Sequence, residues 1–271
     1  MAARGERTTR DGAPPRGLPG VIPPAWASVE PDDPARTAKA ARPVLSREAI
    51  VDAALRIVDA EGYDALSMRR VAQEFGTGAA SLYAYVANRD ELEDLLVDLV
   101  IGQCPAPEPG DPADWQERLK KCLMGSYDVL LSHRDVARAL LGRVPFGPRA
   151  LANVNGLLGV LREAGLPDRI IGYAPAMLGQ YLTTSAIDSQ AWEMRYPDGD
   201  GEAEKARWEQ ITGYLRSLPQ DRFPHVIDFA EHMVSGDHSD QPYNRFELGL
   251  DVLLRGLASF REETGPGSST D

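Results

Sequence analysis

The chain has 271 residues, 43% of them hydrophobic and 26% charged, which is typical of a globular protein with a substantial core. No apolar run approaches the roughly 20 residues that cross a bilayer, and the two cysteines, Cys104 and Cys122, form no C-x-x-C pair, so we expect a cytoplasmic protein with ordinary thiols. A net charge of −12 counts against broad nucleic-acid binding. Residues 67–89 nevertheless carry three arginines against one glutamate, which is compatible with a small basic face.

The first 44 residues contain eight prolines and no sustained apolar period. Such a segment buries too little apolar surface to offset the entropy of ordering it, so we expect a disordered tail over 1–44. Its arginines leave two interpretations open, a passive tail or an arm that contacts DNA.

The pattern over residues 46–75 predicts two helices. Ser46 can cap the first, whose apolar residues recur on one face, and Gly62 ends it. Ser67 can cap a shorter second helix, and Gly76 supplies the backbone freedom to leave it.

Two more helices are expected over residues 78–102. Leu82 and Val86 share the inner side of a short third helix. Asn88 can cap the fourth, with Glu91 three residues later as its capping-box partner and a leucine stripe behind it.

The stretch CPAPEPGDPADW, residues 104–115, predicts a break between two parts of the chain. Every segment beyond it has helical spacing, and no alternating strand pattern is present, so the whole chain is expected to be all-α with roughly nine or ten helices. The expected helices after the break are 114–133, 134–142, 148–165, 167–194, 203–217, 222–235 and 242–260.

The stretch GTGAAS, residues 76–81, resembles the G-x-G-x-x-G fingerprint that holds a dinucleotide pyrophosphate, with Ser81 in place of the last glycine. That fingerprint must follow a β-strand, whereas the preceding SMRRVAQEF has helical apolar spacing. A helix-turn-helix fits instead, because two short helices are joined by a glycine-containing turn and the second can enter the major groove of DNA.

Residues 45–100, LSREAIVDAALRIVDAEGYDALSMRRVAQEFGTGAASLYAYVANRDELEDLLVDLV, resemble the N-terminal DNA-binding domain of the tetracycline-repressor (TetR) family. The resemblance rests on AA and GY around the first helix, R-x-x-A in the second, the turn glycine, LY-x-Y-V in the third and N-R-x-x-L opening the fourth. The run RFELGLDVLLRGLASF, 245–260, resembles the last helix of the branch with a tetracycline-repressor-like C-terminal domain. We therefore expect a tail over 1–44, a three-helix helix-turn-helix domain over 45–103, and a helical effector-binding and dimerisation domain over 104–271.

The resemblance and the helix-turn-helix geometry assign nine residues to DNA. Arg69 is placed to reach a base edge, where arginine paired with guanine is the commonest specific contact, and a solvated surface arginine is the alternative. The exposed side of the third helix is expected to carry small residues and two tyrosines whose hydroxyls can reach phosphate, although either tyrosine could instead face the core. The resemblance implies that Arg89, beside the Asn88 cap, is the basic residue that holds the DNA backbone. The predicted DNA-binding residues are Arg69, Thr77, Gly78, Ala79, Ala80, Ser81, Tyr83, Tyr85 and Arg89.

In this family the C-terminal helices usually enclose a small molecule whose binding releases the DNA. Where the tetracycline-binding branch has a metal-ligating histidine this chain has Leu140, and Leu157 stands at a polar contact, so we expect a hydrophobic effector in place of a magnesium–tetracycline chelate. Each residue predicted for this site could instead be ordinary core or surface. The predicted effector-binding residues are Tyr127, His133, Phe146, Met177, Gln180, Tyr181, Thr184, Asp188 and Trp192.

The helix near 167–190 and the last helix are expected to form a two-fold four-helix interface, and closing the monomer's own core is the alternative use of their apolar stripes. The last helix would contribute Phe246, Leu250, Leu253, Leu254 and Leu257.

The prediction is thus a homodimeric transcriptional repressor that binds a palindromic DNA operator and is released from it by a small hydrophobic molecule. No membrane partner is expected, and no residue set indicates catalysis, a cofactor or a metal site. Two other hypotheses remain, an all-α enzyme or carrier with a vestigial helix-turn-helix, and a DNA-binding protein whose solid core responds only to a protein partner.

Overall fold

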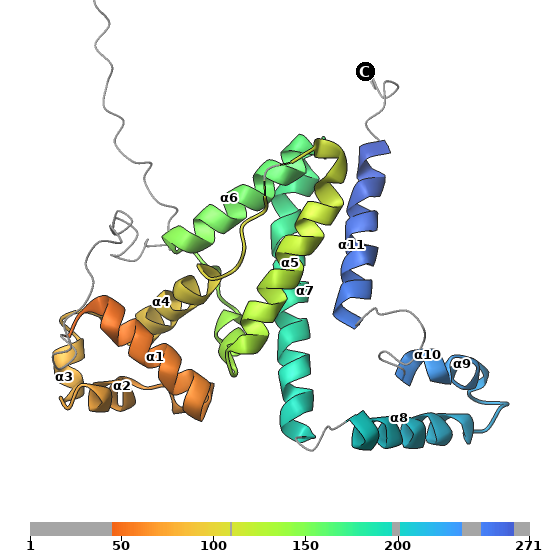
Figure 1. The fold of residues 1–271 in the computed structure, drawn as a ribbon, viewed down its shortest axis with the longest axis horizontal. Coiled ribbons are helices and arrows are strands. Elements are labelled where there is room, and N and C mark those ends of the chain that lie inside the picture. The colour runs from red at the N-terminus through yellow and green to blue at the C-terminus, as the bar shows by residue number, and fades with distance from the viewer. Residues whose placement is uncertain (1–44, 109, 197–200, 235–244, 263–271) are drawn as a thin grey trace, which may run out of the picture. The chain divides into compact units, whose positions relative to one another are not determined.

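The computed structural model describes residues 45–108, 110–196, 201–234 and 245–262, and within these ranges all regular structure is helical (Figure 1). The all-α prediction is confirmed, while the predicted tail over 1–44 and the expected start of the last helix at Pro242 lie outside the described residues. None of the helices described is long and apolar enough to cross a membrane. The α-helices are α1 (Arg47–Glu61), α2 (Met68–Glu74), α3 (Ala79–Leu82), α4 (Arg89–Ile101), α5 (Trp115–Ser132), α6 (Pro148–Glu163), α7 (Asp168–Arg195), α8 (Gly201–Arg216), α9 (Pro224–Asp228), α10 (Ala230–Val234) and α11 (Arg245–Glu262).

The first two helices begin and end at the predicted residues. The Ser46 hydroxyl accepts a hydrogen bond from the Ala49 N–H at 3.1 Å, and Gly62 ends α1 with a φ of 91° that favours glycine. The Ser67 hydroxyl likewise accepts from the Arg70 N–H at 3.1 Å at the start of α2. Both caps satisfy backbone donors that a helix end leaves without a partner.

The third and fourth helices also follow the predicted pattern. Leu82, the last residue of α3, is buried, and so is Val86, which lies after the end of this helix and not in it as expected; Asn88 caps α4 by accepting from the Glu91 N–H at 2.8 Å. The Glu91 carboxylate accepts a hydrogen bond from the Ala87 N–H at 2.6 Å, one residue before the capping residue. The capping box is therefore present in a displaced form.

The larger part of the core lies among α5, α6, α7 and α11, and α5, α7 and α11 run side by side (Figure 1). Trp115, Leu119, Leu161, Leu178 and Leu250 are each 1% exposed or less. Burying a side chain of this size contributes roughly 1.5–3 kcal/mol, so this layer is the main source of stability for the C-terminal domain.

The predicted helix over 222–235 is two short helices, α9 and α10. Phe229 separates them because its φ of −103° and ψ of 7° leave the α-helical region. The preceding helix, α8, is joined to the end of α7 by a stack of Trp192 on Trp208, with ring centroids 4.7 Å apart and planes within 2°.

The apolar stripe of α11 belongs to the chain's own core. Phe246, Leu250, Leu254 and Leu257 are all 4% exposed or less, and Leu253 is partly buried against the same cluster. The assignment of these side chains to a dimer interface is therefore corrected, because α11 packs on α5 and α7 of the same chain and uses its apolar face there.

Candidate DNA-reading face and effector domain

The helix-turn-helix is formed by α2, the turn over residues 75–78, and α3. The turn contains Gly76, whose φ of 63° requires glycine or a strained residue, and the Thr77 N–H donates to the Ala72 carbonyl at 3.1 Å. Gly78 precedes α3, and a Cβ at this position would meet no atom within 4 Å, so the start of α3 faces open space. The backbone at this helix start is accessible to a DNA strand.

Arg69 and Arg70 are adjacent in α2 but have different surroundings. Arg69 is exposed, and no described residue pairs with it. Arg70 is held by Glu61, with Nε–Oε1 at 3.0 Å, and by Glu74 at 2.6 Å. The positive charge of Arg70 is thus used within the protein, and Arg69 is the arginine of α2 whose guanidinium is available to DNA.

The side chains of α3 and the turn are mostly open to solvent. The Thr77 and Ser81 hydroxyls lie 2.8 Å apart and form a hydrogen bond, so a phosphate contact would redirect one of them. Tyr83 is 53% exposed and Tyr85 38% exposed, and neither belongs to the core. Ala80 is exposed, whereas Ala79 packs partly against the core, which makes Ala80 the more accessible methyl group.

Arg89, the predicted basic residue at the start of α4, has an intramolecular partner. Its Nε donates to the Glu93 carboxylate at 2.7 Å, and its guanidinium carbon lies 5.7 Å from the centroid of the Tyr63 ring. The Arg89 side chain is still 46% exposed. Glu93 is not among the residues predicted from the sequence, although its i,i+4 spacing from Arg89 is the usual spacing of a helical ion pair.

A series of contacts links the helix-turn-helix domain to the C-terminal helices. His133 lies here, with Nδ1 3.0 Å from the Asp59 carboxylate of α1 and Nε2 3.0 Å from the Gln103 amide oxygen. Arg138, on the short 3₁₀ helix η4 (Val136–Leu140), pairs with Asp64 at 2.9 Å. His133 was predicted to line the effector site, and the structure positions it between the two domains.

A further contact between the two domains caps the first turn of α6. The buried Asp98 carboxylate of α4 accepts a hydrogen bond from the Ala150 N–H at 2.9 Å, in the first turn of α6. A Cβ on Gly147 would collide with this carboxylate. The cap of α6 therefore comes from a helix of the DNA-binding domain, 52 residues away along the chain.

Four of the predicted effector residues lie together on the exposed face of α7, and another lies in the loop before α6. They are Met177, Gln180, Thr184 and Asp188 on the helix and Phe146 in the loop.

The other aromatic candidates are internal. Tyr127 stacks on Phe246 with centroids 4.1 Å apart, and its hydroxyl lies 2.6 Å from the Ser189 hydroxyl. Tyr181 also stacks on the Phe246 ring, with centroids 5.3 Å apart, and donates to the Phe246 carbonyl at 3.0 Å. Trp192 is half-buried against Trp208. The nine candidates therefore do not line one common cavity in the described part of the chain.

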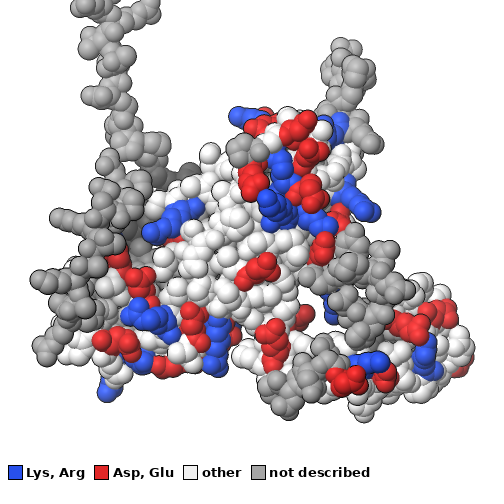
Figure 2. Space-filling model, in the orientation of Figure 1, with Lys and Arg blue, Asp and Glu red and all other residues white. Residues whose placement is uncertain are grey.

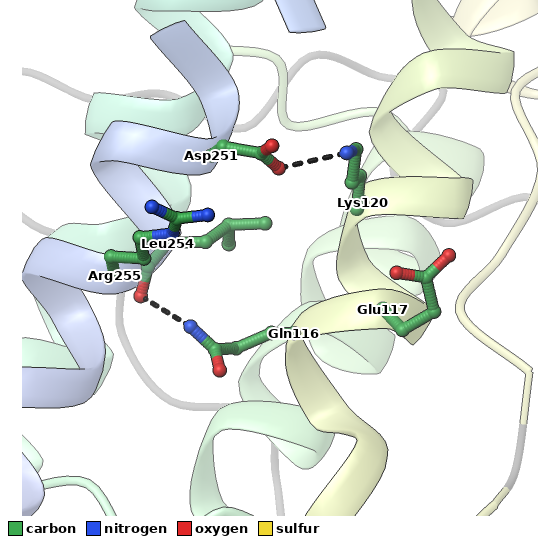
Figure 3. Close-up of a pocket in the computed structure, with 6 residues that line it drawn as sticks. All are labelled: Gln116, Glu117, Lys120, Asp251, Leu254 and Arg255. Atoms are coloured by element: carbon green, nitrogen blue, oxygen red, sulfur yellow. Dashed lines mark hydrogen bonds and ion pairs between the residues drawn. The ribbon is translucent and has the colours of Figure 1, made fainter. Parts of the chain in front are cut away.

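Hollows among the described residues include the following two. One of about 160 Å³ lies between α5 and α11, where Lys120 pairs with Asp251 at 2.8 Å and Gln116 donates to the Leu254 carbonyl at 3.1 Å (Figure 3). The other, of about 370 Å³, is lined by the ends of α5 and α7 and includes Gln190. Neither hollow contains the predicted effector residues.

On the face of the molecule in Figure 2, Lys and Arg side chains are interspersed with Asp and Glu side chains.

Comparison with known proteins covers nearly all of the described chain. Residues 50–94 match the family described as bacterial regulatory proteins, tetR family, and residues 106–261 match the tetracyclin repressor-like C-terminal domain. The HTH-type transcriptional repressor DrrR1 of Streptomyces coeruleorubidus is 31% identical over 238 residues, which cover 85% of each chain. The class C tetracycline repressor protein of Escherichia coli is 27% identical over 81% of this chain and 94% of its own.

Solved structures give the same result. Apo ActR from Streptomyces coelicolor is 40% identical, with a TM-score of 0.70 over 81% of this chain and 97% of ActR. ActR in complex with actinorhodin is also 40% identical, with a TM-score of 0.68 over 79% of this chain and 96% of that one. The chain therefore belongs to the TetR family of helix-turn-helix transcriptional regulators, and it is a DNA-binding repressor and not an enzyme.

Proposed function

We propose that this repressor binds a palindromic operator as a homodimer in the cytoplasm and is released by a small, predominantly apolar aromatic molecule. The observation that carries the effector class is the 40% identity to ActR, which has been solved in complex with actinorhodin and with (S)-DNPA. Release requires that the effector binds one conformation of the dimer better than the other.

The dimer is supported by apolar side chains on the outer faces of α7 and α11. Tyr173 is 79% exposed and Met177 38% exposed on α7, while Leu248 is 57% and Val252 63% exposed on α11. Large apolar side chains gathered on neighbouring helices favour burial against a second protein surface. We call the DNA-binding domain of one protomer, with helices α1 to α4, its reading head. A two-fold axis through α7 and α11 would present two reading heads to two half-sites, which explains why a palindrome is expected.

In each reading head we assign base recognition chiefly to Arg69. It is the exposed arginine of α2, whereas Arg70 is held by two glutamates. The hydroxyl of Thr77 lies in the turn, that of Ser81 in α3 and that of Tyr83 directly after it, and all three are suited to phosphate or base edges. The small side chains of α3 leave few other groups to read the sequence.

The internal stack of Tyr127, Phe246 and Tyr181 supports a planar aromatic effector. An aromatic ligand can replace one of the ring contacts within this stack at little cost, since offset rings 4.5–7 Å apart attract one another. Neither described hollow includes a residue of this stack, so the stack has to open on binding. Leu157 is buried in the same domain and gives a magnesium chelate no polar ligand.

The decisive experiment selects duplexes from random sequence with the full chain and then tests release of the best duplex. Actinorhodin, tetracycline with Mg²⁺, and a panel of apolar drugs are added while complex formation is followed by fluorescence anisotropy. Recovery of an inverted repeat is expected, together with release by actinorhodin or by an apolar aromatic compound of the panel. Release by magnesium–tetracycline alone would overturn the effector class, and release by no compound would favour a core that responds to a protein partner.

A further inference from the structure

Glu93 is a buried carboxylate held between two arginines from different domains. Its side chain is 5% exposed. One oxygen accepts a hydrogen bond from Nε of Arg89 at 2.7 Å, and the other pairs with the guanidinium of Arg143. Burial, and after it the neighbouring Glu93 carboxylate, raise the pKa of Tyr63. A buried charge is tolerated when it is paired in this way.

The two arginines differ in what else they can contact. Arg89 begins α4 in the reading head, is 46% exposed and is the proposed phosphate contact. Arg143 lies in the segment between η4 and α6, in the C-terminal domain, and is 21% exposed. Its other terminal nitrogen donates to Asp94 at 2.7 Å. One carboxylate thus joins a DNA-facing arginine to the domain that is proposed to bind the effector.

We infer that Glu93 is an electrostatic link through which the segment carrying Arg143 sets how much of the Arg89 charge is available to DNA. The inference rests on the proposed phosphate contact of Arg89. While Arg143 is in place, the charge of Glu93 is divided between two guanidinium groups. When Arg143 withdraws, Arg89 is the remaining cation on a buried carboxylate and is held more firmly, because an unpaired buried charge is costly. Glu93 is then a positioning residue that acts on DNA through Arg89.

The link predicts opposite effects for changes at its two ends. Arg143→Met should weaken binding to the selected duplex about fivefold or more. It should also make the negative slope of log affinity against log salt less steep, by about 1 per protomer. Glu93→Gln should make that negative slope steeper and strengthen binding to a random-sequence duplex, because Arg89 is freed. In the double variant Arg143→Met should have no further effect, since the carboxylate through which it acts is gone.

Arg149→Met is the matched control. Arg149 also reaches from the C-terminal domain to a buried carboxylate of α4, pairing with Asp98 at 3.5 Å. Asp98 keeps the Ala150 N–H and makes no contact with Arg89, so affinity and salt slope should stay at the wild-type values. Circular dichroism and thermal unfolding establish that every variant is folded before DNA is added.

Two results overturn the link. One is an equal loss of affinity in Arg143→Met and Arg149→Met, which would indicate general loosening between the domains. The other is a loss in Arg143→Met that persists in the Glu93→Gln background. Arg89→Ala separates this failure from that of the proposed function, because an unchanged salt slope there would overturn the phosphate contact itself.

Discussion

The reading head and the C-terminal domain begin their helices in different ways. In the head, α1, α2 and α4 each start at a residue whose own side chain caps the helix, namely Ser46, Ser67 and Asn88. In the C-terminal domain, α5, α6 and α7 start at residues that make no such hydrogen bond, and these helices are 18, 16 and 28 residues long. The four-residue α3 has no side-chain cap, so local capping accounts for three of the helix starts in the head, whereas α5, α6 and α7 are held chiefly by packing of an apolar face.

The start of helix α6 illustrates this difference between the two domains. Its first turn is capped by Asp98 from α4, so the hydrogen bond that a local serine or asparagine provides in the head is provided here by tertiary structure. The head is therefore specified mostly by neighbouring residues, and the C-terminal domain by residues far apart in the chain.

The largest expected effect tests packing in the C-terminal domain. Leu250 is fully buried, so Leu250→Ala should lower the free energy of unfolding by about 2–5 kcal/mol, measured by urea titration followed by circular dichroism. Leu248 on the same helix is 57% exposed, and Leu248→Ala should mainly shift sedimentation equilibrium toward monomer. Equal losses of stability at the two positions would contradict the assignment of the α11 faces.

The next effect concerns DNA reading by the head. Arg69→Ala should cost about 1–3 kcal/mol of operator binding and relax preference at one base pair, measured by anisotropy with a set of substituted operators. Arg70→Ala is the neighbouring control and should leave base preference unchanged, because Arg70 is held by Glu61 and Glu74. Unaltered operator affinity in Arg69→Ala would be incompatible with its assigned role.

Local capping predicts a smaller loss. Ser67→Ala should lower the free energy of unfolding by about 1 kcal/mol, because the Arg70 N–H loses its acceptor. Asp114 begins α5 without a side-chain cap, and Asp114→Ala should therefore cost less. Thermal unfolding of both variants tests the comparison directly, and a larger loss at Asp114 would reverse it.

Arg89→Ala should act equally on all sequences. Removal of one phosphate contact lowers the salt slope by about 1 per protomer and weakens selected and random duplexes by the same factor. A salt series on both duplexes measures this effect, and a change in base preference would instead indicate direct reading.

The smallest effect lies at high pH. Burial is the main cause that raises the pKa of Cys122 to about 11 from its ordinary value of 9.0. Because the folded-state pKa is the higher one, this thiol contributes stability that is present below pH 9 and is lost as the pH rises through about 11. Unfolding titrations should show this loss in the wild type and less of it in Cys122→Ala. Alkylation by iodoacetamide at pH 8 should be slow, and rapid alkylation would contradict burial of the thiol.

The predicted residues that the structure places as expected are mainly those whose positions depend on neighbouring residues in the sequence. Ser46, Ser67 and Asn88 follow from capping, and Gly76 from the need for a positive φ. The exposure of Arg69 followed from its position in a short helix, but the neutralisation of Arg70 depends on Glu61, nine residues earlier on another helix. The DNA roles themselves remain predictions.

Helical periodicity does not predict which of the effector candidates are exposed and which are internal, because it does not specify what covers each face of a helix. Gln180, Thr184 and Asp188 share a polar face of α7 that the structure leaves exposed, while Tyr181 turns inward onto Phe246. His133 lies between the domains because Asp59 and Gln103 are brought to it by folding. A polar residue on a leucine-rich helix is equally compatible with all these environments.

By itself the sequence determined the all-α class, the helix-turn-helix and the helix ends of the reading head, since these depend on caps, turn glycines and periodicity within a few residues. Only the tertiary structure decided that α11 fills its own core, that Asp98 caps α6, and that Glu93 is shared by Arg89 and Arg143. The Asp98 cap and the Glu93–Arg143 pair join residues 52 and 50 positions apart, and the burial of α11 is a choice between two faces of one helix. They arise from packing of whole helices, which no short stretch of sequence encodes.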